Sequence, residues 1–204
     1  MEVEIDKLNT RALKDLIKIP EGLKMSKNSR PDWDSFYLSM CYLISVRSSC
    51  RDRQIGAVIV KDKTIIATGF NGAPRGVSDC MERNECIRKD RDKSLGKDYE
   101  NCYSAHAEVN ALANHAYMGG PEMNGATLYT GVYPCVICSK LLINAGISRI
   151  VYAERLRNDN GLAEKMFKEV GIKVEKINKD KIAATIYKAL DHLVLRDEFG
   201  EEPH

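Results

Sequence analysis

The chain has 204 residues, of which 44% are hydrophobic and 29% charged, and its formal net charge is +2. This length suits one domain with a sizeable core, and the balanced charge argues against a dedicated nucleic-acid surface. No apolar run approaches the roughly 20 residues of a membrane-spanning helix, and the acidic residues 1–6 do not resemble a signal peptide. We therefore expect a cytoplasmic protein with no membrane or nucleic-acid partner, in which seven cysteines serve metal binding better than disulfides.

Residues 1–31 predict an N-terminal helical arm, with residues 32–204 forming the main domain. The arm's apolar positions recur at helical spacing, at Leu8, Ala12, Leu13, Leu16 and Ile17. Because this apolar stripe is weak, the arm either packs on the surface of the domain or contacts another subunit.

The main domain is expected to begin with a buried helix, followed by two strands. Asp32 or Asp34 can cap the helix, whose apolar positions are dense over residues 36–46. The β-branched runs at 55–60 and 64–70 are separated by a short polar loop, which is typical of an antiparallel hairpin.

A glycine-rich segment, residues 69–76, follows the hairpin. Its glycines permit positive φ and close approach of the backbone to a ligand, although Asn71-Gly72 on its own can be an ordinary turn. Residues 77–104 are polar and irregular, so this long insertion is either functional or held together by something other than a core. Acidic and basic side chains alternate there, which favours a solvated mixed surface over a nucleic-acid patch. The basic members are Arg83, Arg88, Lys89, Arg91, Lys93 and Lys97.

Strands and helices alternate after residue 105. A helix is expected to begin at His106 and another to carry Cys135 and Cys138, with Pro134 in its first turn. The strands expected here are 126–132, 149–153 and 172–177. The remaining helices are 162–170 and about 180–195, and the last helix and the tail together make up residues 180–204. This alternation predicts an α/β fold, a mixed sheet with helices on both faces.

Two short stretches, His106-Ala107-Glu108 and Pro134-Cys135-Val136-Ile137-Cys138, carry the chemistry. One imidazole and two thiolates provide the three protein ligands of a catalytic zinc, leaving a position for water. Glu108 is then available as an acid and base beside the metal. This H-x-E and P-C-x-x-C pattern is the signature of zinc deaminases that act on cytosine or adenine.

With these residues placed, the sequence resembles the cytidine deaminase superfamily, and within it the deoxycytidylate (dCMP) deaminases. The similarity runs over residues 47–152 and includes G-x-N-G-x-P-x-G at 69–76 and H-A-E-x-N-A at 106–111. The resemblance implies a three-layer α-β-α fold around a mixed five-stranded sheet. It also implies a homo-oligomer, often a hexamer, that hydrolyses dCMP to dUMP for dTMP supply, often with dCTP and dTTP as effectors.

The resemblance further implies roles for individual residues. Glu108 would protonate N3 of the pyrimidine and then the departing ammonia, while Asn71 and Ala107 would contact the substrate. The turn residues of the family pattern would shape the nucleotide pocket or an effector site. These residues are Gly69, Gly72, Pro74 and Gly76.

One departure from the family pattern affects the substrate. Arg155-Leu156-Arg157 stands where members often carry an aromatic residue. Arg155 and Arg157 either hold phosphate bidentately, which would admit dCTP as a second substrate, or only decorate a loop.

Three more functions are compatible with the same zinc motif. The protein could deaminate a modified cytosine, act on a nucleic acid with the same core, or serve as an inactive assembly subunit. Glu108 argues against the inactive subunit, because a structural metal site needs no proton shuttle. The balanced charge argues against the nucleic-acid deaminase.

Four further cysteines, Cys50, Cys80, Cys86 and Cys102, flank or lie within the insertion 77–104. Four thiolates make a closed structural zinc site. Some dCMP deaminases resemble this chain in carrying a second, structural zinc at such positions, which would explain an ordered insertion without an apolar core. Free buried cysteines or a disulfide would also account for these residues.

Overall fold

A computed structural model describes residues 30–88, 102–156 and 161–195, with side chains described as far as residue 190. Its five strands are β1 (Gly56–Lys61), β2 (Thr64–Phe70), β3 (Thr127–Val132), β4 (Arg149–Glu154) and β5 (Lys173–Lys176). They form one sheet in the order β2-β1-β3-β4-β5. Strand β1 pairs antiparallel with β2 and β3, whereas β3, β4 and β5 are parallel, so the predicted mixed sheet is confirmed.

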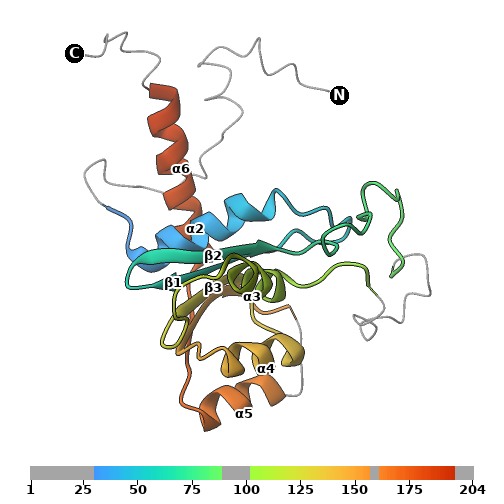
Figure 1. Cartoon of the computed structure of the whole chain (residues 1–204). Coiled ribbons are helices and arrows are strands. Elements are labelled where there is room, and N and C mark those ends of the chain that lie inside the picture. Colours follow the sequence, from blue (N-terminus) through green and yellow to red (C-terminus); the bar gives the residue numbers. More distant parts are fainter. Residues whose placement is uncertain (1–29, 89–101, 157–160, 196–204) are drawn as a thin grey trace.

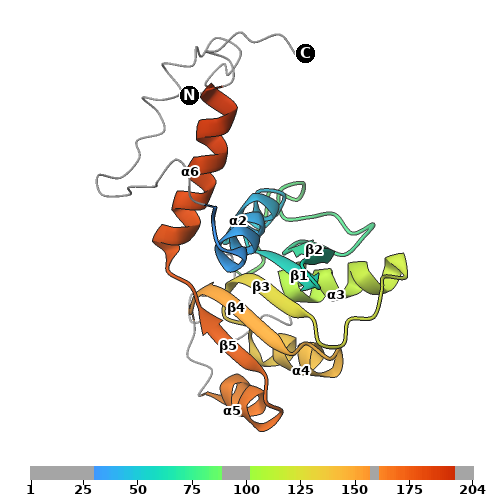
Figure 2. The ribbon, with the colours of Figure 1, turned by 90° about the vertical axis from the view of Figure 1, so that its left-hand side faces the viewer.

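Helices cover both faces of this sheet (Figures 1 and 2). The helices on one face are α3 (Ala107–Met118), α4 (Val136–Asn144) and α5 (Leu162–Glu169), and those on the other are α2 (Trp33–Ser45) and α6 (Lys179–Leu195). Helix α6 extends away from the sheet past α2 (Figure 2). The three-layer α-β-α fold is therefore confirmed. None of the helices in the described part of the chain is long and apolar enough to cross a membrane.

The period-two pattern of the strands builds a core on each face. Ile59, Leu128 and Ile150 face α3–α5, whereas Val58 and Val151 face α2 and α6. All five side chains are fully buried.

Two glycines let helices approach the sheet closely. A Cβ on Gly56 would lie 2.0 Å from the carbonyl oxygen of Cys41 in α2, and one on Gly69 would lie 2.3 Å from the amide nitrogen of Ala111 in α3. Gly69 therefore sets the distance between β2 and α3, the helix that carries Glu108.

The observed elements differ from the expected ones mainly at their ends. Strand β5 spans Lys173–Lys176 rather than 172–177, and α5 ends at Glu169. Helix ends fray and edge strands are short, so small pattern errors concentrate there. Residues 1–29 of the expected N-terminal arm, Arg157 and the tail beyond residue 195 lie outside the described residues.

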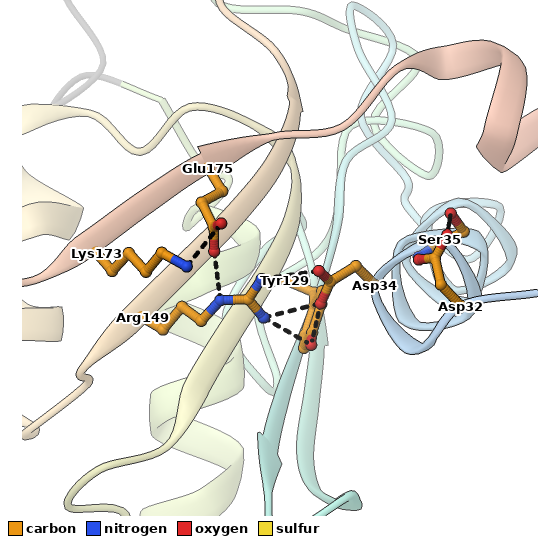
Figure 3. Close-up of polar contacts among 7 residues, drawn as sticks. All are labelled: Asp32, Asp34, Ser35, Tyr129, Arg149, Lys173 and Glu175. Carbon is orange, nitrogen blue, oxygen red and sulfur yellow. Dashed lines mark hydrogen bonds and ion pairs between the residues drawn. The ribbon is translucent and has the colours of Figure 1, made fainter.

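A charge network ties α2 to three strands (Figure 3). The guanidinium of Arg149 in β4 donates two hydrogen bonds to Asp34, at 2.8 and 2.7 Å, and one to Glu175 of β5, at 2.6 Å. The hydroxyl of Tyr129 in β3 donates to Asp34 at 2.8 Å. Hydrogen bonding from Arg149 holds the pKa of the Asp34 carboxyl below its ordinary value, against the opposing effect of burial.

We expect Asp34→Asn to lower the free energy of unfolding at pH 7 by about 2 kcal/mol, since it weakens charge-assisted hydrogen bonds that are partly shielded from water. The lowered pKa means that this stabilisation is present above the ordinary Asp value of about 3.9 and is lost as pH falls through the folded value. Urea unfolding at pH 7 and at successively lower pH should therefore show the two proteins converging below about pH 4.

Asp62→Asn is the matched control, because Asp62 lies exposed in the β1–β2 loop. Equal stability of the Asp34 variant and wild type at pH 7 would contradict a stabilising role of the network.

Candidate active site

The ligand-type residues lie at two helix N-termini. His106 is the N-cap of α3 and Cys135 the N-cap of α4, each with extended backbone. The prediction that His106 and Cys135 lie within helices is therefore wrong by one position, and Pro134 precedes the α4 cap. The Cys135 sulfur accepts a hydrogen bond from the Cys138 amide at 3.4 Å, so it satisfies an N–H group that the first helical turn leaves open.

His106, Cys135 and Cys138 converge, with their ligand atoms all within 4.8 Å of one another. The His106 Nδ1 lies 3.3 Å from Cys138 Sγ and 3.4 Å from Cys135 Sγ. Tetrahedral zinc, with bonds of about 2.0–2.1 Å to nitrogen and about 2.3 Å to sulfur, separates such atoms by roughly 3.5 Å. The spacing and the donor set both fit zinc.

The environment of the cluster favours a bound cation. Hydrogen bonds from Cys138 and His106 lower the pKa of the Cys135 thiol to about 4. The pKa of Cys138 is raised, because that thiol keeps the proton it shares with the Cys135 thiolate. Hydrogen bonding to Cys135 raises the pKa of His106. The lowered pKa of Cys135 favours its thiolate, which is the form that binds metal.

Glu108 lies beside the three ligands, in the first turn of α3. Its side chain is 5% exposed, and Cys138 Sγ lies 3.8 Å from its Oε2. Burial raises the pKa of the Glu108 carboxyl, with the charge of His106 acting in the opposite direction. A carboxyl whose pKa moves towards neutrality is suited to both accepting and donating a proton.

A pocket of about 880 Å³, measured out to its open mouth, is lined by His106, Glu108 and Cys135. Three of the predicted substrate-binding residues line this pocket: Asn71, Ala107 and Arg155. The other members of the glycine segment do not line the pocket. These are Gly69, Gly72, Pro74 and Gly76.

Asn71 is held by the chain itself. Its Oδ1 accepts hydrogen bonds from the Ser48 hydroxyl at 2.7 Å and the Ile55 amide at 2.8 Å, and its Nδ2 donates to the Arg53 carbonyl at 2.8 Å. Its amide therefore fixes the segment that leads into β1. An amide nitrogen has two N–H groups, so one remains for a further partner.

The four remaining candidate ligands adjoin this pocket. Cys50 and Cys102 line it, whereas Cys80 and Cys86 are buried. Burial raises the pKa of the Cys80 thiol, and a hydrogen bond with Ser104 acts in the opposite direction. The other three cysteines each lie close enough to Cys80 to raise its pKa further. All seven cysteines are free thiols, which excludes a disulfide in this structure. The His106 cluster is the one group among the described residues whose ligand atoms meet the 4.8 Å spacing.

The structure also brings unexpected residues into the pocket. Asp52, Arg53, Arg88 and Tyr133 line it. The solvated surface expected for the insertion is wrong for Arg88, whose side chain is 19% exposed. Tyr133 lies next to the P-C-x-x-C stretch and stacks under Arg155, whose guanidinium carbon is 4.2 Å from the ring centroid. Sequence periodicity carries no signal for these contacts, because they join distant segments.

The three-layer α-β-α fold and a His/Cys/Cys cluster with a buried glutamate define a zinc-binding protein of the cytidine deaminase type. Residues 31–154 match the family described as cytidine and deoxycytidylate deaminase zinc-binding region. The chain belongs to this family.

Two similar proteins are named deoxycytidylate deaminase. The chain is 40% identical over 129 residues to the deoxycytidylate deaminase of Mycobacterium phage D29, covering 61% of this chain and 96% of that protein. It is 39% identical over 136 residues to the Schizosaccharomyces pombe deoxycytidylate deaminase, covering 66% and 41%. The chain thus spans less than half of the yeast protein's length.

Among solved structures, the dCMP deaminase of cyanophage S-TIM5 in complex with dCMP and dUMP superposes with a TM-score of 0.60 at 28% identity. The match covers 74% of this chain and all of the phage chain.

Proposed function

We propose that this protein is a zinc-dependent hydrolase that converts dCMP to dUMP and ammonia. The observation that carries the proposal is the buried Glu108 beside three metal-type ligands at the wall of an open pocket. The names of the similar proteins, and the dCMP and dUMP bound to the S-TIM5 enzyme, support the substrate.

The residues divide the chemistry between them. His106, Cys135 and Cys138 would hold the zinc, which would supply a water of lowered pKa, about 7 instead of 15.7. The Glu108 carboxylate takes one proton from the attacking water and delivers it to N3 of the pyrimidine. It then takes the second proton of the same water and delivers it to the amino group, which departs as ammonia. Glu108 is 5% exposed, so its carboxyl has little contact with bulk water.

The pocket favours deamination of dCTP as a second candidate activity. Three arginines line it, Arg53, Arg88 and Arg155, and each can bind phosphate oxygens through a planar fork. Such a concentration of positive charge suits one phosphate or several.

Ammonia release from four substrates tests the function. We expect dCMP to be deaminated, with cytidine far poorer and single-stranded DNA inert. The ratio of kcat/KM for dCMP to that for dCTP decides between the two candidate activities. Failure to deaminate any free nucleotide would contradict the proposal.

The proximity of Cys50, Cys80, Cys86 and Cys102 supports a second, structural zinc. A zinc bound there would hold the cysteines of the insertion against the pocket wall, because Cys50 and Cys102 would be zinc ligands and also line the pocket. The zinc content of wild type and of Cys86→Ser tests this assignment.

Exposed apolar side chains on α3 and α4 support a homo-oligomer. Met118 is 76% exposed, Ile137 54% and Leu141 41%. Exposed apolar surface, where it is contiguous, is typical of protein contacts. A hexamer, regulation by dCTP and dTTP, and a cytoplasmic location stay predictions.

A further inference from the structure

Helix α3 carries two functional side chains at its start without the usual side-chain cap. His106 is the N-cap residue, yet its side chain makes no capping hydrogen bond. Its imidazole instead lies 3.3 Å from the Cys138 sulfur and 3.4 Å from the Cys135 sulfur. N-cap side chains normally bond to an open N–H group of the first turn and so stabilise it. Other contacts must therefore fix the turn that carries His106 and Glu108.

The chain immediately before His106 is paired with the glycine-rich segment. Ala105 and Gly72 form an antiparallel bridge. The Gly72 amide donates to the Ala105 carbonyl at 3.2 Å, and the Ala105 amide donates to the Gly72 carbonyl at 2.9 Å. These two backbone bonds fix the residue that precedes the metal-type ligand.

Asn110 joins the same segment from the other end of the turn. Its backbone amide donates to the His106 carbonyl at 2.9 Å, which closes the first helical turn. Its side-chain Nδ2 donates to the Phe70 carbonyl at 2.7 Å and to the Gly72 carbonyl at 3.5 Å. An amide nitrogen has two N–H groups, so it can make both bonds at once. The first turn of α3 is thus fastened to the glycine-rich segment at both of its ends.

Strand β2 lies against the backbone of this turn, and α3 runs along the strand (Figure 2). A Cβ on Gly69 would lie 2.4 Å from the carbonyl oxygen of Ala107, the residue between His106 and Glu108. No side chain therefore separates the strand from the helix at this point. The position of the turn depends on the hydrogen bonds at its ends rather than on interlocking side chains.

A second asparagine makes a comparable contact one turn further along α3. Asn114 Nδ2 donates to the Thr68 carbonyl of β2 at 2.8 Å, and its Oδ1 accepts a hydrogen bond from Arg75 at 2.7 Å. Asparagine is a weak helix former, so these contacts with the edge strand β2 account for its presence at both positions. Asn114 is further from the metal-type ligands than Asn110 and offers a comparison with it.

Resting on the proposed function, we propose that Asn110 is a positioning residue of the active site. Its two side-chain hydrogen bonds hold the first turn of α3 against the glycine-rich segment. They thereby keep His106 oriented towards the metal and Glu108 oriented for proton transfer. Asn110 does not line the pocket, so it acts through these two residues rather than on the substrate. Gly72, which does not line the pocket either, serves the site as the other half of this contact.

Asn110→Ala and Asn114→Ala form a matched pair that tests this role. Each replaces a half-buried asparagine of α3 by alanine, the strongest helix former, so the helix itself is not weakened. We expect Asn110→Ala to raise the zinc Kd of the His106 cluster by roughly 10- to 100-fold, the range for lost contacts that orient a histidine ligand. In Asn114→Ala this Kd should stay unchanged. Competition with a chromophoric chelator measures it, and comparison with Cys135→Ser identifies the zinc of the His106 cluster.

Turnover and stability complete the comparison. In zinc-saturated Asn110→Ala, kcat for dCMP should fall by roughly 100-fold, since a small misplacement of a reacting group has an effect of that size. KM should change little, because Asn110 does not line the pocket. Asn114→Ala should keep the wild-type kcat. The urea midpoints of both variants should fall by similar amounts, because each variant loses side-chain hydrogen bonds to the glycine-rich segment or to β2.

Wild-type zinc affinity and kcat in Asn110→Ala would overturn the assignment, since Asn110 would then serve stability alone. Equal losses of zinc affinity in the two variants would overturn it as well, because the effect would not be specific to the first turn. A wild type that turns over no dCMP would contradict the proposed function, and the zinc Kd of the two variants would still decide the positioning role.

Discussion

Glu108→Gln is expected to lower kcat for dCMP by roughly 10⁴-fold, the upper range for general acid and base catalysis. Glutamine preserves the shape of the side chain and its ability to hydrogen-bond, but it cannot accept and return a proton. In the proposed mechanism Glu108 serves two successive proton transfers, so both would be lost together. Steady-state ammonia release measures the effect.

The variant should remain folded and metal-loaded, since Glu108 is beside the ligands rather than among them. Unchanged zinc content and unchanged dUMP binding therefore belong to the expected result. Glu122→Gln, at an exposed glutamate away from the pocket, is the control and should retain full activity. A Glu108 variant as active as wild type would mean that another group carries the proton.

Cys135→Ser is expected to lose activity but keep its stability, whereas Cys86→Ser is expected to lose stability and keep most of its kcat. Serine at Cys135 removes a ligand of the His106 cluster, so activity should fall to background and zinc content by one per chain. The α4 cap keeps an oxygen acceptor, because serine is itself a good N-cap residue, so the free energy of unfolding should change little. Atomic emission analysis and urea unfolding together measure both quantities.

Serine at Cys86 should lower the free energy of unfolding by about 3 kcal/mol or more, since loss of a bound metal is among the causes of the largest destabilisations. Zinc content should again fall by one per chain, while kcat changes much less than in the Cys135 variant. Cys41→Ala is the control, because Cys41 is buried in the α2 core apart from both clusters and should not alter zinc content. One zinc per wild-type chain would contradict the second site.

Local pattern predicted most of the fold. Two β-branched runs separated by a short polar loop located β1 and β2, and the strand–helix alternation after residue 105 predicted helices on both faces. The helix starts were misplaced at His106 and Cys135, because an N-cap residue and a first-turn residue differ in backbone conformation, which composition does not specify. The sheet order placing β1 between β2 and β3 depends on pairing between distant segments.

The sequence by itself determined the metal chemistry, because His106, Glu108, Cys135 and Cys138 lie in two short motifs whose spacing is a local property. Only the tertiary structure decided what surrounds them. The side chain of Asn71 anchors residues 48–55 and has one N–H group left for a ligand. Arg88 belongs to a charged run for which a solvated surface is expected, but it lines the pocket. Burial and contact between distant segments depend on the three-dimensional packing of the whole domain, so the wall of the pocket cannot be predicted from local spacing.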